Sequence, residues 1–200
     1  MFFLRSAPAW DEVTYWALDL ETSGLDPKRH LILSAGMVPV RAGVVRWGER
    51  WESLVKPPAG ERVPDEGLRA HHILPGDLEH APVLDDVLPE IESRLREGVA
   101  LLHFAPLDLG FLRAACARRG RAWPKPRIVD TVDLLLKLHH RRHHLTPHPT
   151  PPRTALPEAR EDLGLPSYAN HHALTDALAT VELFLALRAR LQARTLADLS

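Results

Sequence analysis

Residues 13–27 read VTYWALDLETSGLDP, and this stretch decides the fold. Its first eight residues are apolar, aromatic or β-branched apart from one acid, which predicts a buried strand over residues 13–20. The turn-forming residues Thr-Ser-Gly-Leu-Asp-Pro then follow Glu21 and end the strand. Because side chains alternate along a strand, Asp19 and Glu21 point to one face while Leu20 points to the other. The strand therefore brings two carboxylates to its carboxyl end, where open α/β sheets usually bind ligands.

The remainder of the chain mixes strand and helix patterns. Apolar or alternating runs predict further strands at residues 30–40, 44–55, 99–104 and 128–129. Helical spacing of apolar residues predicts helices at 83–96, 107–119, 132–138 (capped by Asp130) and 173–191. A group of strands followed by alternating helices and strands is typical of an α/β fold, with a mixed β-sheet flanked by α-helices.

Composition limits the class of protein. With 45% hydrophobic and 26% charged residues, the 200 residues fit a single domain, its core over about residues 13–190. No apolar run approaches the roughly 18 residues of a membrane-spanning helix, so we expect a cytoplasmic chain with no membrane contact. The lone Cys116 excludes an internal disulfide and a cysteine-based zinc site, so any metal would need oxygen or imidazole ligands.

Charge and histidine are unevenly distributed. The formal net charge is −1, yet residues 109–157 hold ten basic and only two acidic residues. This pattern fits either a polyanion bound beside a cation site or chance segregation of surface charge. Within that stretch, residues 139–157 combine five histidines with several prolines, which predicts a surface loop. Transition-metal binding by these histidines is the alternative interpretation.

Two histidine and aspartate pairs are further candidates for a site. The spacing His-x4-Asp occurs four times, so the spacing alone selects none of them. His103 and Asp108 stand out because they join the end of a predicted strand to the next helix, at the same sheet edge as the first acidic pair. His171 and Asp176 could face one centre only if His171 lies before the helix and bends back. His172, four residues from Asp176, is the alternative imidazole.

Three segments resemble the motifs of the DnaQ-like DEDDh 3′-to-5′ exonucleases, in the order of that family. They are DLETSGLDP at 19–27, HFAPLDLGFL at 103–112 and HHALTDALAT at 171–180. The resemblance covers about residues 13–190 and implies a ribonuclease-H-like fold. It also implies two divalent cations, with the metal ligands Asp19, Glu21, Asp108 and Asp176. The general base implied by the resemblance is His171 rather than His172.

A fourth segment, PDEGLRAHHI at 64–73, is similar to the one that closes over the terminal nucleotide in proofreading exonucleases of bacterial polymerases. By this likeness Glu66 and His71 contact the substrate, and Thr22 contacts the 3′ end. His72 stands where the family usually has glycine.

The second motif departs from the family pattern His-Asn-Ala. This chain has Phe104 in place of the asparagine and Leu107 in place of the usual phenylalanine. Since Asp108 itself is retained, we expect a slower rate rather than a loss of activity.

The chemistry of these residue types agrees with the family's reaction. Four carboxylates in one cleft repel each other unless cations bind among them, and oxygen-only ligands suit Mg²⁺ or Mn²⁺. Two such ions can stabilise an in-line displacement at phosphorus, while a histidine removes a proton from water. We therefore expect hydrolysis of single-stranded 3′ ends, DNA favoured over RNA, to nucleoside 5′-monophosphates. The basic segment from Arg113 to Arg127 is a candidate track for the strand.

Three alternatives stay open. The chain could be a proofreading subunit held by a DNA polymerase, although the short stretch after the last predicted helix favours a stand-alone nuclease. It could be a catalytically silent nucleic-acid-binding domain, which would have no physical need for four repelling carboxylates. It could also be a metal-buffering protein built around the histidines at 139–148.

Overall fold

The computed structural model describes residues 7–61, 63, 73–168 and 171–200. Its strands are β1 (Tyr15–Thr22), β2 (Ile32–Arg41), β3 (Val44–Val45), β4 (Trp51–Leu54), β5 (Val99–Leu102) and β6 (Ile128–Asp130). Its α-helices are α2 (Pro75–Glu79), α3 (Leu84–Glu97), α4 (Ala105–Arg118), α5 (Thr131–His143), α6 (Leu156–Asp162) and α7 (Ala173–Leu191). Short 3₁₀ helices are η1 (Trp10–Glu12), η2 (Trp47–Glu49) and η3 (Leu196–Leu199).

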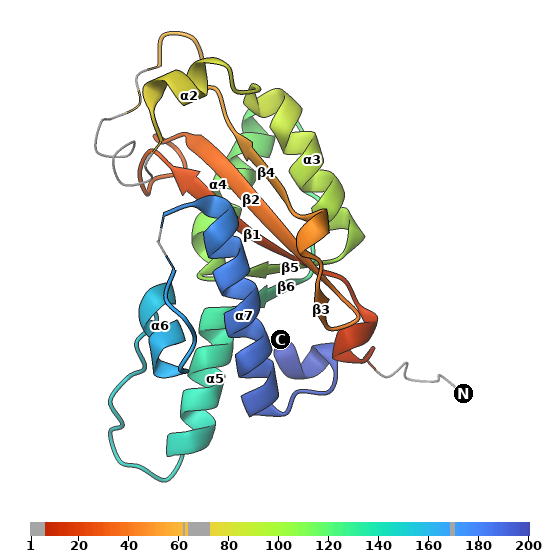
Figure 1. The fold of residues 1–200 in the computed structure, drawn as a ribbon, viewed down its shortest axis with the longest axis vertical. Coiled ribbons are helices and arrows are strands. Elements are labelled where there is room, and N and C mark those ends of the chain that lie inside the picture. Colours follow the sequence, from red (N-terminus) through yellow and green to blue (C-terminus); the bar gives the residue numbers. More distant parts are fainter. Residues whose placement is uncertain (1–6, 62, 64–72, 169–170) are drawn as a thin grey trace.

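The six strands of the described residues form one mixed sheet (Figure 1). Its order is β3-β2-β1-β5-β6, with β4 also paired to β2. The β1–β2 and β2–β4 pairs are antiparallel, whereas β1–β5 and β5–β6 are parallel. The predicted mixed sheet flanked by helices is therefore confirmed. The strand β1 lies at the centre, as expected for its nearly continuous apolar sequence.

Helices cover both faces of the sheet, and the alternation along β1 assigns its side chains to two cores. Tyr15 and Ala17 belong to the core beneath α5 and α7. Trp16, Leu18 and Leu20 belong to the core beneath α3 and α4. No helix within the described ranges is both long enough and apolar enough to cross a bilayer.

Most element boundaries agree with the sequence, and α7 covers the predicted range 173–191. The predicted strand over 44–55 is wrong in its middle, because residues 47–49 form the 3₁₀ helix η2 and split it into β3 and β4. The predicted helices at 83–96 and 107–119 are α3 and α4, each shifted by one or two residues.

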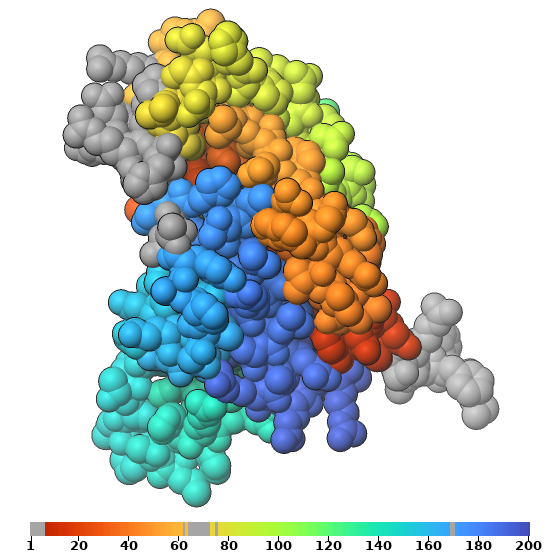
Figure 2. Space-filling model, viewed as in Figure 1, coloured from red at the N-terminus to blue at the C-terminus, as the bar shows by residue number. Residues whose placement is uncertain are grey.

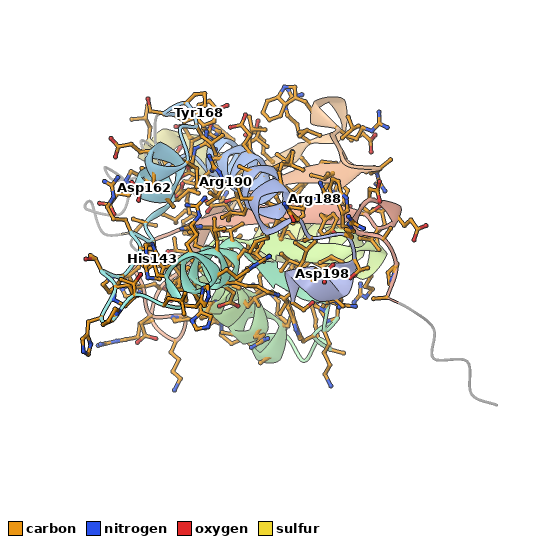
Figure 3. All side chains as sticks on the ribbon, turned by 90° about the horizontal axis from the view of Figure 1, so that it is seen from below. His143, Asp162, Tyr168, Arg188, Arg190 and Asp198 are labelled. Carbon is orange, nitrogen blue, oxygen red and sulfur yellow. The ribbon has the colours of Figure 1, made fainter. Side chains whose placement is uncertain are left out.

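The prediction of a loop over 139–157 is wrong at both ends. Helix α5 continues to His143, so His139, His140 and His143 are helical, and Figure 3 labels His143 at the end of this helix. Basic side chains are favourable in the last turn of a helix, and no proline interrupts α5. At the other end, Leu156–Asp162 forms α6, whose proline stands in the first turn. Proline is tolerated there because a backbone N–H in the first turn has no acceptor within the helix, so the missing N–H costs no hydrogen bond.

Candidate active site

Strand β1 and helix α7 bring three carboxylates together. Asp19 and Glu21 lie two residues apart on β1, on the face that packs beneath α7. Asp176 lies in the first turn of α7. One carboxylate oxygen from each of these three residues lies within 4.8 Å of the others. Segments separated by more than 150 residues in sequence thus form one acidic cluster.

Gly36 permits this close approach. It lies on β2 directly opposite Asp19 in the antiparallel register. A Cβ atom at this position would lie 2.3 Å from the backbone nitrogen of Leu174 and 2.4 Å from the carbonyl carbon of Ala173. Since real contacts are never so short, only glycine lets the first turn of α7 rest on the strand. Gly36 could not be recognised from the sequence, because a strand pattern does not show where a helix will cross.

Asp108 joins the acidic cluster from the opposite layer. The parallel pairing of β1 with β5 reaches only Ala17, so the backbone N–H of Leu20 has no partner from β5. This N–H donates to Oδ1 of Asp108 at 3.0 Å. Asp108 is only 6% exposed. The expected convergence of Asp108 on the end of β1 is therefore observed.

Asp130 holds the turn that leads to Asp108. Its carboxylate accepts hydrogen bonds from the backbone N–H groups of Phe104 (3.0 Å) and Ala105 (2.7 Å) and from that of Val132 (2.9 Å). It therefore caps the start of both α4 and α5, which satisfies donors that a helix cannot satisfy itself. The sequence predicted only the cap of α5. The cap of α4 could not be predicted, since it depends on β5 and β6 being neighbours.

The electrostatics of the cluster favour protonation when no cation is present. Burial raises the pKa of Asp19 well above its usual range, and the charges of Asp108, Glu21 and Asp176 raise it further. Burial also raises the pKa of Asp108 to about 7, against the lowering effect of the Leu20 hydrogen bond. The pKa of Asp176 is raised by burial and by Glu21. Each of these shifts would be reversed by positive charge bound among the carboxylates.

The two neighbouring histidines have different surroundings. His171 lies before α7 with a left-handed φ of 68°, and its backbone N–H donates to Oδ2 of Asp176 at 2.9 Å. A positive charge on His171 also lowers the pKa of Asp176, against the larger effect of burial. The loop position that the sequence required of His171 is observed, and its backbone turns back to Asp176. His172 instead approaches Glu52 on β4, with 3.9 Å between Nε2 and the carboxylate. Figure 2 shows blue residues of α7 beside the orange part of the chain, which includes β4.

Of the remaining predicted residues, Thr22 and His103 lie within the described part of the chain, and Glu66 and His71 do not. Thr22 is buried at the end of β1, and its hydroxyl donates to the carbonyl oxygen of Gly24 at 2.8 Å. Glu66 and His71 lie outside the described residues, as does His72. His103, which the sequence placed at the same sheet edge, hydrogen-bonds the Thr131 hydroxyl and the Thr154 carbonyl through its ring.

The donor atoms of the cluster fit divalent cations. All are carboxylate oxygens, which are the ligands preferred by Mg²⁺ and Mn²⁺. The buried Oδ1 of Asp176 accepts no hydrogen bond from the part of the chain that the structure describes. A buried carboxylate oxygen without a donor is costly unless a cation or water satisfies it. The acidic cluster thus has the chemistry of a divalent-cation site.

Comparison with known proteins identifies related sequences and folds. A family model described as Exonuclease, that of RNase T, matches residues 16–184. The PolC-type DNA polymerase III of Thermotoga maritima is 30% identical over 183 residues, which are 91% of this chain but only 12% of that protein. The chain thus spans a small part of the first curated relatives it matches.

Two solved structures share the fold. The nuclease domain of 3′hExo, described as a DEDDh family member bound to rAMP, has a TM-score of 0.71 at 15% identity and covers 92% of this chain and 94% of its own. Exonuclease I of E. coli in complex with a dT13 oligonucleotide has a TM-score of 0.77 at 17% identity and covers 90% of this chain and 42% of its own. Their shared fold is the ribonuclease-H-like fold of these nucleases.

Proposed function

Because this chain belongs to the RNase T exonuclease family, we propose that it is a metal-dependent 3′-to-5′ exonuclease acting on single-stranded nucleic acid. It releases nucleoside 5′-monophosphates, prefers DNA to RNA and acts in the cytoplasm. The observation that supports this proposal best is the convergence of Asp19, Glu21 and Asp176, with oxygens within 4.8 Å, beside the buried Asp108.

In this proposal the four carboxylates hold two Mg²⁺ or Mn²⁺ ions. When bound, the ions neutralise the carboxylates and stabilise the charge that develops on the phosphate. Asp19 and Glu21 contribute from the rigid centre of the sheet, whereas Asp108 and Asp176 contribute from the first turns of α4 and α7. Ligands on regular elements are held more precisely than ligands on loops.

His171 is the proposed general base. It accepts a proton from the water that attacks the phosphorus of the last internucleotide linkage. The bond between this phosphorus and the 3′ oxygen of the preceding nucleotide breaks, and that oxygen takes up a proton from solvent. The carboxylates cannot take this role, since their oxygens are occupied by the cations. The backbone bond from His171 to Asp176 ties the loop to the cluster, which supports this choice over His172. Glu66, His71 and Thr22 keep their proposed contacts with the substrate.

A test uses oligonucleotides labelled at the 5′ end, as DNA and as RNA, with Mg²⁺, with Mn²⁺ and with chelator. Progressive shortening from the 3′ end that requires a divalent cation is expected. Asp19→Asn should abolish it. The chain offers a matched control in Asp77→Asn, because Asp77-Leu78-Glu79 on helix α2 repeats the Asp-Leu-Glu tripeptide with both of its acids exposed. Equal activity in Asp19→Asn and the wild type would overturn the proposal.

A polymerase-associated role is the second candidate, since the similar protein of Thermotoga maritima carries a polymerase in its name. In that case a DNA polymerase from the same cell should copurify with the chain and raise its activity on a mismatched primer end. A silent nucleic-acid-binding domain would instead bind the oligonucleotide in every condition and shorten it in none.

A further inference from the structure

A second site with basic character lies away from the carboxylates. It is a cavity of about 390 Å³ formed by the β1–β2 loop, the segment after β4, the start of α3 and the end of α4. Its charged Lys, Arg, Asp and Glu lining residues are Lys28, Arg29, Lys56, Arg118, Arg119, Glu61 and Asp85. Five cations against two carboxylates leave the cavity positively charged.

Most of these cations have no carboxylate partner among the residues that the structure describes. Arg119 is the exception, since it forms a bidentate pair with Asp85 at 2.9 and 3.2 Å. Arg118 and Lys56 donate only to backbone carbonyls, at 3.0 and 2.8 Å. Lys28 and Arg29 are exposed at the tip of the loop. A cavity that gathers uncompensated cations in this way attracts an anion.

The cavity is connected to the acidic cluster by α4 and by the β1–β2 loop. The loop begins directly after Thr22, and its Pro27 packs against α4 so closely that a Cβ at Gly110 would lie 3.1 Å from Pro27 Cγ. The carbonyl of Pro27 also accepts the bond from Arg118. From Asp108 to Arg118 the helix rises about 15 Å. A strand whose 3′ end lies at the carboxylates can therefore reach the cavity within a few nucleotides.

We propose that this cavity binds backbone phosphate of the single strand, upstream of the bond that is cleaved. The inference rests on the proposed function and assigns the path that the substrate takes away from the catalytic carboxylates. Lysine and arginine are the side chains that bind phosphate, and a positively charged groove is the usual track for a single strand. A free nucleotide offers the same phosphate chemistry, so the experiment includes one.

The test compares the double variant Lys28→Glu/Arg29→Glu with the wild type. Neither side chain forms a hydrogen bond or ion pair within the described residues, so the fold is expected to persist. The matched control is Arg46→Glu/Arg142→Glu, which changes the charge equally at two exposed positions outside the cavity. Circular dichroism of all three proteins confirms folding.

Binding is measured by fluorescence anisotropy in chelator, so that it does not depend on hydrolysis. For a labelled oligonucleotide of about 16 nucleotides, we expect roughly 10-fold weaker binding in the cavity variant. The slope of the logarithm of the binding constant against the logarithm of the salt concentration should fall by the equivalent of about two phosphate contacts. The control variant should bind like the wild type. Equal weakening in both variants would overturn the proposal. The proposal would also fail if the cavity variant bound adenosine monophosphate more weakly than the wild type but bound the oligonucleotide equally well, because the cavity would then be a mononucleotide site.

The kinetics of cleavage test the proposal a second way, by comparing a long oligonucleotide with a dinucleotide. With the long oligonucleotide and Mg²⁺, the cavity variant should raise KM roughly 10-fold at unchanged kcat. A dinucleotide has one internucleotide phosphate, which would lie at the carboxylates, so its cleavage should not change. An equal loss on the dinucleotide would overturn the proposal. If the wild type hydrolyses no oligonucleotide, the proposed function fails while the binding comparison still tests the cavity.

Discussion

At the scale of single residues, the backbone conformation of Phe104 shows what its departure from the family's asparagine costs. Its φ of 62° and ψ of 58° are left-handed, a conformation that asparagine and glycine tolerate and other residues adopt at a cost of about 1–2 kcal/mol. The family's asparagine at this position therefore has a backbone reason, and this chain retains the backbone with a less suitable residue. The two hydrogen bonds that the backbone N–H groups of Phe104 and Ala105 donate to Asp130 hold the turn in place despite the strain.

Replacing Phe104 with asparagine should stabilise the protein. Phe104 is 55% exposed, so little apolar burial is lost, while relief of the left-handed strain should raise the free energy of unfolding by about 1 kcal/mol. Urea denaturation measures the change. Leu145→Asn, at an exposed apolar position, serves as the control for removing apolar surface. A lower stability in Phe104→Asn would mean that the ring contributes contacts that outweigh the strain.

His171 and His172 can be separated by matched substitutions. His171→Asn retains a residue that tolerates the positive φ and keeps the backbone bond to Asp176, but it removes the proposed base. We expect kcat to fall roughly 100-fold or more, in line with general-base contributions. His172→Asn should stay within a few-fold of the wild type. The reverse ranking would assign the base to His172.

At the scale of secondary-structure elements, the sequence predicted what depends on local pattern. The alternation of β1, the apolar stripe of α3 and the whole of α7 were predictable because each element shows its own periodicity. The length of α5 and the existence of α6 were not, since the prolines and histidines of residues 139–157 obscure the helical pattern. The break between β3 and β4 was not predictable either, because apolar and aromatic residues continue on both sides of the short helix η2. The positions of Gly36 and Asp130 depend on contacts between elements, which no single stretch of sequence reveals.

Gly36→Ala tests whether the crossing of β2 and α7 sets the site. The added methyl group collides with backbone, which cannot rotate away as a side chain can, so the first turn of α7 must move. Asp176 moves with it, and we expect kcat to fall more than 10-fold, since small displacements of catalytic groups are costly. Gly48→Ala, where a Cβ meets nothing within 4 Å, is the control. Activity near that of the wild type in Gly36→Ala would show that the helix adjusts without disturbing the carboxylates.

At the scale of the whole molecule, three layers meet at one end of the sheet. The carboxylates come from β1 in the centre, α7 on one face and α4 on the other (Figure 1). The family resemblance predicted this set of residues, and the structure shows why they can meet: β1 extends beyond its pairing with β5 and leaves space for both helices. That all residues form a single domain stays a prediction.

This arrangement predicts how the stability of the metal-free protein depends on pH. The pKa of Asp108 is about 7 when folded, against 3.8 for an ordinary aspartate, so the folded state holds a proton that the unfolded state loses over this range. The contribution of Asp108 to the free energy of unfolding should therefore be largest below about pH 4 and should fall as the pH rises to 7. The raised pKa of Asp19 and that of Asp176 act in the same direction.

Thermal unfolding in chelator between pH 5 and pH 8 measures the effect, using Tm at each pH. Asp108→Asn should flatten the decline, because asparagine does not titrate, whereas Asp77→Asn should leave it unchanged. Mg²⁺ should raise Tm more at pH 8 than at pH 5, since the ions bind the ionised carboxylates and compete with protons for them. A cation effect that is equal at both pH values would mean that the ions bind elsewhere, and the link between the three layers and a metal centre would fail.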